Sequence, residues 1–200
     1  MRKTSTEFAE KGTYANVENV VASATCRQRI DLDSIVKAFP YAEYRPERFP
    51  GLIFKLNKPK TATLIFTSGK MICTGAKSKQ SAKKAVLEVV TELRKRGIEV
   101  DGRPEIQIQN IVASGSLGAP VNIEETARVL DNTIYEPDQF PGLIYRMREP
   151  KVVMLIFSNG SIVCTGAKQE SNIDEAVKRL RQILEENNLI SIDQSKHALT

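Results

Sequence analysis

Histidine is scarce in this chain of 200 residues, and the only one, His197, lies close to the C-terminus. A zinc site or a histidine-based catalytic apparatus therefore has almost no material from which it could be built. We expect a protein with no metal site and no cofactor.

Cysteine is also sparse. Three cysteines cannot all pair, and no CxxC motif occurs, so we expect no disulfide framework. Cys73 and Cys164 each precede a threonine in two similar segments. Both are interpreted as small buried hydrophobic residues.

Long apolar runs are missing as well. No stretch approaches the ~18 consecutive apolar residues of a membrane-spanning helix, and the N-terminus lacks the apolar core of a signal peptide. We therefore expect a protein that makes no membrane contact and is located in the cytosol or in a compartment that shares its solvent.

The chain repeats itself at a constant shift of 91 residues. The segment LIFTSGKMICTGAK, from Leu64, returns as LIFSNGSIVCTGAK from Leu155, and 16 of the 29 residues over 49–77 are identical to their partners. Two long copies indicate a duplicated domain with a pseudo-two-fold axis, because a solenoid needs three or more shorter units. The predicted organisation is a flexible N-terminus at 1–13, repeats at 14–104 and 105–190, and a flexible tail at 191–200.

Charge divides the chain unevenly, although its net value is only +5. Residues 14–104 carry 17 Lys and Arg against 9 Asp and Glu, whereas residues 105–195 carry 8 against 13. The basic half predicts a polyanionic partner, and the acidic half predicts a partner of another kind.

Apolar spacing predicts the order β-α-β-β-β-β-α in each repeat. In the first repeat, the strands are expected near 14–23, 42–45, 51–56, 61–66 and 70–75, and the helices at 31–39 and 79–96. Two helices can cover only one face of such a sheet. The long helix also has a basic outer face, which is either merely solvated or binds a second protein or upstream DNA.

Strand alternation assigns residues to the two faces of the sheet. Met71 and Cys73 are assigned to the helix-covered face, and Ile72 and Thr74 to the other. The uncovered face is predicted to collect Val17, Asn19, Val21, Leu64, Phe66, Ile72, Thr74 and their copies. An exposed apolar face of this size, bordered by lysine and arginine, is typical of an interaction site.

These paired motifs resemble the TATA-box-binding protein family of archaea and eukaryotes. The resemblance rests on QNIVASG, FPGLIYRM, LIFSNG and CTGAK, with their first-repeat copies, and covers about 14–190. It implies an α+β fold, a pseudo-two-fold saddle of two β-α-β-β-β-β-α repeats with a ten-stranded curved antiparallel sheet and four helices on the convex face. The short N-terminus is similar to archaeal members, which implies an archaeal cell and association with its nucleoid, whereas a eukaryotic member would be nuclear.

The same resemblance implies a general transcription initiation factor. Such a factor binds the minor groove of A·T-rich TATA-box promoter DNA, kinks it by Phe insertion, and recruits transcription factor B and RNA polymerase. The kinking, for which this family is a standard example, is implied by the resemblance alone. The predicted face agrees chemically, because an apolar sheet cannot read the major groove, whereas A·T pairs show only acceptors in the minor groove.

The resemblance assigns roles to individual positions. The DNA-intercalating residues are Phe49, Phe66, Phe140 and Phe157. The base-edge contacts are Asn19, Asn110, Thr74, Thr165, Val21, Val112, Leu64, Leu155, Ile72 and Val163. The phosphate-binding residues are Arg48, Lys55, Lys70, Lys77, Arg146 and Lys168, and Ser161 stands where the copy of Lys70 would be. The residues that dock transcription factor B are Glu136, Asp138 and Gln139, in the loop where YEPDQFPG replaces YRPERFPG.

Other interpretations stay open at this point. A phenylalanine taken alone is usually a core residue. A buried asparagine without a partner costs about 1–3 kcal/mol, so Asn19 and Asn110 either donate to adenine N3 and thymine O2 or cap a strand. An enzyme is not expected, because no acid–base pair or nucleophile–histidine set recurs in both repeats. The same sheet could instead bind an apolar peptide or small molecule, with no DNA function, although the basic border and the Phe pairs would then be unexplained.

Overall fold

The computed structural model describes residues 5–8 and 12–191, and the chain forms two compact units. The central unit comprises Asn19–Asn110, and the terminal unit combines the described residues up to Glu18 with those from Ile111 onward. Their boundaries fall inside strands β2 (Thr13–Thr25) and β6 (Glu105–Ser116). The first strand of each sequence repeat is therefore divided between the units, so that a unit and a repeat are not the same set of residues.

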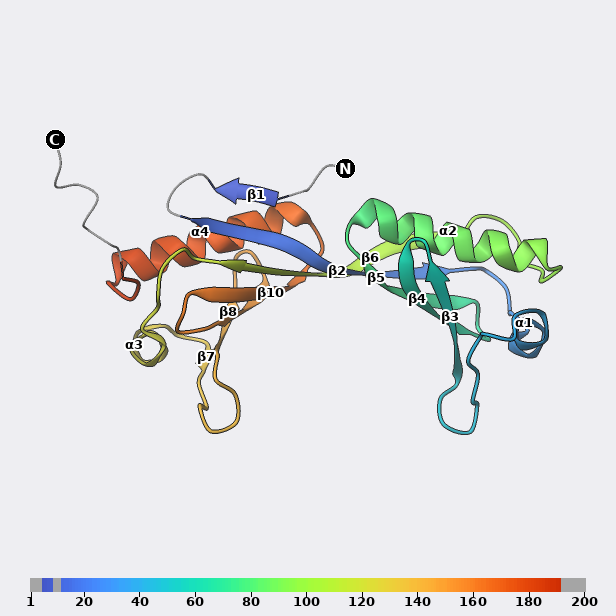
Figure 1. The fold of residues 1–200 in the computed structure, drawn as a ribbon, viewed down its shortest axis with the longest axis horizontal. Helices are drawn as coiled ribbons and strands as arrows, with labels where there is room; N and C mark the ends of the chain where they lie inside the picture. Colours follow the sequence, from blue (N-terminus) through green and yellow to red (C-terminus); the bar gives the residue numbers. More distant parts are fainter. Residues whose placement is uncertain (1–4, 9–11, 192–200) are drawn as a thin grey trace. The chain divides into compact units, whose positions relative to one another are not determined.

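The central unit contains a sheet with two helices. Its hydrogen-bonded strand order is β3-β4-β5-β2-β6, and β3, β4, β5 and β2 pair in antiparallel fashion. Its further elements are α1 (Leu32–Ala38), β3 (Gly51–Asn57), β4 (Lys60–Phe66), β5 (Lys70–Ala76) and α2 (Lys79–Lys95). Figure 1 shows α2 lying along one side of these strands.

The terminal unit has the same arrangement. Its strand order is β2-β6-β10-β9-β8-β7, and a short strand, β1 (Ser5–Phe8), pairs with the first part of β2. Its further elements are α3 (Ile123–Val129), β7 (Thr133–Ile134), β8 (Leu143–Met147), β9 (Val152–Ile156), β10 (Ser161–Ala167) and α4 (Glu170–Glu186). The predicted α+β class, with two antiparallel repeats and four helices among the described residues, is confirmed.

One strand prediction was wrong. The strand expected at 42–45 is only an isolated bridge between Glu43 and Ile53, and its copy, β7, has two residues. Pro40 and Pro46 flank the predicted segment, and proline removes a backbone donor and restricts the residue before it. Strand β1 lies within the segment expected to be flexible, and its four residues are too few to give a strand signal. His197 and the rest of the expected tail from 192 onward lie outside the described residues.

The core of the central unit lies between the sheet and its helices. Met71 and Cys73 on β5 are fully buried, and they belong to one apolar cluster with Ile35 of α1 and Val86 of α2. This confirms the predicted helix-covered face. Helix α2 begins where the Ser78 hydroxyl accepts a hydrogen bond from the Ser81 N–H at 3.0 Å.

All three cysteines are buried and free. Burial raises the pKa of each thiol, and raises that of Cys164 to about 12. The interpretation of Cys73 and Cys164 as small buried hydrophobic residues is confirmed.

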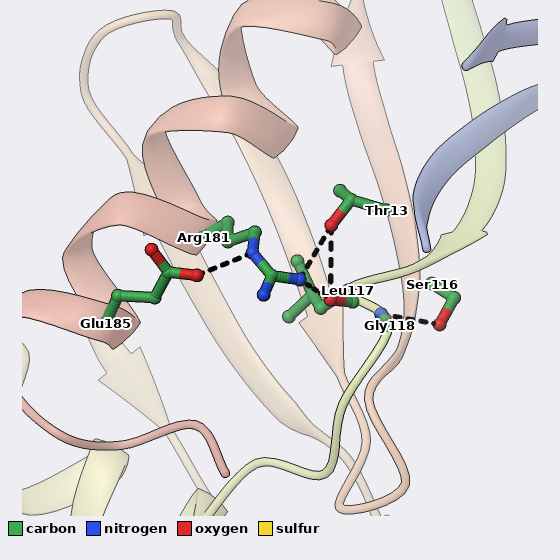
Figure 2. Close-up of polar contacts among 6 residues, drawn as sticks. All are labelled: Thr13, Ser116, Leu117, Gly118, Arg181 and Glu185. Carbon is green, nitrogen blue, oxygen red and sulfur yellow. Dashed lines mark hydrogen bonds and ion pairs between the residues drawn. The ribbon is translucent and has the colours of Figure 1, made fainter. Parts of the chain in front are cut away.

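An arginine connects three elements of the terminal unit (Figure 2). Arg181 of α4 donates to the Thr13 hydroxyl at 2.7 Å and to the Leu117 carbonyl, and its Nε donates to Glu185 at 2.8 Å. Thr13 begins β2 and Leu117 follows β6, so one half-buried cation holds both strands against the helix. Val90, the counterpart of Arg181 in the sequence repeat, is buried in the apolar core of the central unit.

Within the described ranges, none of the helices combines the length and apolar character needed to cross a bilayer. The same residues contain no group of three or more His, Cys, Asp or Glu side chains placed to hold a metal ion.

Candidate nucleic-acid interface

The face of the central sheet that the helices leave uncovered contains a continuous apolar row. Strand register places Ile53, Leu64 and Ile72 side by side across β3, β4 and β5, and Ile72 faces Ser23 of β2. None of these three apolar side chains is buried, and Ile72 is 38% exposed, whereas Ile65 and Met71, which alternate with them, are fully buried. The row is therefore accessible from one side.

The terminal sheet repeats this row. Ile144, Leu155 and Val163 lie side by side across β8, β9 and β10, and Val163 faces Ser114 of β6. The flanking residues Met154, Ile156 and Cys164 are buried. Both units thus present three large aliphatic side chains that end at a serine.

A pair of phenylalanines lies at one edge of each row. Phe49 and Phe66 have ring centroids 5.9 Å apart at an interplanar angle of 67°, and Phe140 and Phe157 repeat this geometry at 5.8 Å and 66°. Phe49 is 40% exposed. The rings are packed edge to face on each other and are not core residues, as a wedge that enters stacked bases requires.

A glycine lies beneath each pair of rings. A Cβ atom on Gly51 would be 2.6 Å from Phe49 Cε1 and 2.9 Å from Phe66 Cε1. On Gly142 it would be 2.7 Å from Phe140 Cε1 and 3.0 Å from Phe157 Cε1. The FPG motif is therefore explained sterically, because only a residue without a side chain leaves room for both rings.

A shared turn positions the first ring of each pair. The N–H groups of Arg48 and Phe49 both donate to the Arg45 carbonyl at 2.9 Å, and those of Gln139 and Phe140 donate to the Glu136 carbonyl at 2.9 Å. In both units this loop projects beyond the strands, away from the long helix (Figure 1). The backbone is the same in the two loops, and only the charge of the side chains differs.

Asn19 is held by the neighbouring strand. Its Oδ1 accepts from the Gly75 N–H at 2.7 Å, and its Nδ2 donates to the Thr74 hydroxyl at 3.0 Å. Gly75 has a φ of 97° and lies where the register between β2 and β5 shifts, so its N–H has left the ladder. The structural interpretation of Asn19 therefore holds for its carbonyl oxygen, and its amide nitrogen donates to the Thr74 hydroxyl of the same strand pair.

The other predicted base contacts are half-buried on their strands: Val21, Asn110, Val112 and Thr165. Val17, predicted for the same face, is also half-buried. In β2 the buried residues are Thr13 and Ala15 and then Val20 and Ala22, so the alternation changes parity between them. The change falls where β2 passes from one unit to the other, because each part buries its inward side chains in a different core.

The predicted phosphate contacts are all exposed: Arg48, Lys55, Lys70, Lys77, Arg146 and Lys168. Lys55 donates to Glu43 at 2.5 Å, and this contact lowers the pKa of the Glu43 carboxyl. Both partners are more than half exposed, so the pair contributes little to stability and leaves the lysine able to exchange partners. Glu136, Asp138 and Gln139 are exposed on the second loop.

Several surface residues escaped the sequence prediction. Ile53 and Ile144 extend the two rows, and the alternation of β3 and β8 would have found them. Glu18 and Gln109 also reach the uncovered face, where Ser114 donates to Glu18 at 2.7 Å and Gln109 donates to Ser23 at 2.7 Å. The parity change hid these last two residues from any argument based on simple alternation.

Comparisons with known proteins agree with this geometry. The family model described as "Transcription factor TFIID (or TATA-binding protein, TBP)" matches residues 15–96 and 105–187. The chain is 49% identical over 187 residues to the TATA-box-binding protein of Pyrobaculum calidifontis, covering 94% of each chain. It is 53% identical over 165 residues to that of Sulfolobus acidocaldarius, covering 82% of this chain and 84% of the relative.

A solved structure, that of Methanococcus jannaschii TBP, superposes with a TM-score of 0.80 at 46% identity, covering 86% of this chain and 98% of that one. Both repeats, their strand order and the apolar face with its Phe pairs are thus accounted for together: the chain belongs to the TATA-binding protein family.

Proposed function

We propose that this protein is a transcription initiation factor that binds the minor groove of A·T-rich TATA-box promoter DNA and kinks it. It recruits transcription factor B and RNA polymerase to the promoter, in the nucleoid of an archaeal cell. The observation that carries the proposal is the pair of apolar rows, each edged by two phenylalanines that pack edge to face and for which a glycine leaves room. Membership of the family supports it, since the relatives are named TATA-box-binding proteins.

Each part of the surface has a task in this binding mode. The aliphatic rows lie on the floor of the opened groove, where A·T pairs offer no donors. The amide of Asn19, oriented by Gly75, donates to adenine N3 or thymine O2. The Phe rings enter between base pairs, and the energy of unstacking is offset by the larger surface that bent DNA covers. The exposed lysines and arginines contact phosphates.

Fluorescence anisotropy with a TATA duplex and a G·C-rich duplex tests DNA binding. About six phosphate contacts predict a slope of roughly −5 for log K against log salt concentration. The A·T-rich duplex should bind at least tenfold more tightly than the G·C-rich one. A slope near zero would contradict the proposal and favour an apolar peptide or small molecule as the ligand.

Asn19→Asp separates the structural task of this residue from its DNA contact. The carboxylate keeps an acceptor for the Gly75 N–H but replaces the outward donor with another acceptor. We expect thermal stability to change little while affinity for the TATA duplex falls at least tenfold. Asn19→Ala is the matched control, because it removes both groups and should lower stability by about 1 kcal/mol as well.

Recruitment of transcription factor B is assigned to the acidic loop of the terminal unit. Arg45 and Arg48 of one loop are replaced by Glu136 and Gln139 in the other, although the backbone turn is the same. Acidic side chains beside DNA do not help phosphate binding, whereas complementary charge selects protein partners and raises association rates.

The double variant Glu136→Arg with Asp138→Arg, compared in binary and ternary gel shifts, tests this assignment. We expect DNA binding that is normal or slightly tighter, together with loss of the ternary complex with transcription factor B. A ternary complex that forms as in the wild type would mean that the loop has no docking role.

A further inference from the structure

The serines that end the two apolar rows have different hydrogen-bond partners. In the central unit the row ends at Ser23, whose hydroxyl accepts from the Gln109 amide at 2.7 Å. In the terminal unit it ends at Ser114, whose hydroxyl donates to the Glu18 carboxylate at 2.7 Å. Glu18 and Gln109 are equivalent in the 91-residue repeat, as are Ser23 and Ser114. An amide thus occupies this position in one unit and a carboxylate in the other.

Glu18 lies on the face that the helices leave uncovered. Ile111 and Ala113 of β6 are buried, and Val112 and Ser114, which alternate with them, are not. The Ser114 side chain therefore points to the uncovered face, and the Glu18 carboxylate bonded to it lies there too. Glu18 is itself exposed.

The substitution changes what each unit can offer to a base edge. Gln109 both donates and accepts, and because it donates to Ser23, the Ser23 hydroxyl keeps its own proton for another acceptor. A carboxylate can only accept hydrogen bonds. The Glu18 carboxylate accepts the one that the Ser114 hydroxyl donates, so this hydroxyl has no proton left for another acceptor. The central unit is therefore rich in donors at this position, and the terminal unit is rich in acceptors at the equivalent position.

The donor-rich position and the acceptor-rich position match different base pairs in the minor groove. An A·T pair presents only acceptors there, whereas a G·C pair adds the guanine N2 amino group, which is a donor. The acceptor-rich position of the terminal unit therefore disfavours A·T pairs and matches guanine. The donor-rich position of the central unit matches A·T pairs.

We propose that Glu18 determines specificity: it favours a guanine N2 amino group at the base step it faces, whereas Gln109 favours A·T at the equivalent step. The inference rests on the proposed minor-groove function and deepens it. It makes an otherwise duplicated surface read the two halves of the box unequally, so that the box need not be symmetric.

The experiment uses 2,6-diaminopurine, which adds the N2 amino group to an A·T pair without changing the base pairing partner. Each adenine of a TATA duplex is replaced in turn, and binding is measured by anisotropy for wild type, Glu18→Gln and the reciprocal variant Gln109→Glu. Thermal unfolding of each variant verifies that it is folded, as expected for exposed side chains.

Wild type should tolerate the added amino group at positions in one half of the box only. Glu18→Gln should lose this tolerance by about tenfold, the size of one hydrogen bond to a charged group. It should also bind the unmodified duplex more tightly. Gln109→Glu should gain tolerance in the opposite half.

Two results would overturn the inference while leaving the proposed function intact. In one, Glu18→Gln gains affinity equally for every duplex, which would mean that the carboxylate only repels DNA. In the other, the tolerance pattern is the same in all three proteins. Failure of wild type to bind any A·T-rich duplex would overturn the proposed function, and this inference with it.

Discussion

Replacing Gly51 with alanine would place a methyl group where two aromatic rings already lie. Its Cβ would be 2.6 Å from Phe49 Cε1 and 2.9 Å from Phe66 Cε1, whereas carbon atoms pack best at about 3.5–4.0 Å. At least one ring must therefore move by about 1 Å. The backbone itself accepts alanine, because Gly51 does not have a positive φ.

The cost should appear in DNA binding more than in stability. Overpacking a closed core costs about 1–3 kcal/mol, but Phe49 is 40% exposed and can turn into solvent instead. Alanine also lowers the entropy of the unfolded chain, which offsets about 0.4–1 kcal/mol. We expect Gly51→Ala to lose less than about 2 kcal/mol of stability. A displaced wedge no longer offsets unstacking, which costs a few kcal/mol per step, so affinity should fall at least tenfold and bending should decrease.

The free energy of unfolding comes from denaturant titration, the affinity from anisotropy, and the bend from energy transfer between dyes at the ends of the duplex. Gly142→Ala, which affects the equivalent ring pair, should behave in the same way. DNA binding and bending equal to wild type would refute the steric argument. So would an equal loss of affinity when Gly51→Ala is added to a variant that already lacks both rings, Phe49→Ala with Phe66→Ala.

Two predictions concern the fold. Arg181→Met should lower the free energy of unfolding by about 1–3 kcal/mol in denaturant titration, because buried Thr13 and Leu117 lose a charged donor. The control is Arg179→Met, which removes an exposed contact to Glu149 at 4.0 Å and should change the free energy of unfolding by less than about 0.5 kcal/mol. An equal effect of both variants would show that the buried contacts are unimportant. All three thiols should resist iodoacetamide at pH 8 in the native protein, since burial raises their pKa and lowers the thiolate population. All three should react once the protein is unfolded in guanidinium. Rapid labelling of the native protein would contradict their burial.

The sequence by itself determined the repeat and most of the elements. Identical motifs at a shift of 91 residues gave two copies of one domain, and apolar spacing placed β3, β4, β5 and α2 to within one residue. These signals are local, because alternation and helical periodicity depend only on neighbours along the chain. The assignment of Ile72 to an uncovered face followed from the same alternation and is confirmed by its exposure.

Only the tertiary structure decided which side chains meet. The parity change in β2 comes from its passage between two cores, so simple alternation could not bring Glu18 to the uncovered face. The need for glycine at position 51 follows only from the two rings that pack against it. The hydrogen bond from the Gly75 N–H to the Asn19 carbonyl oxygen could not be predicted either, since it depends on a bulge that frees an N–H 56 residues away in the sequence. Contacts across strands depend on register, and register is set by the packed sheet and not by any single segment.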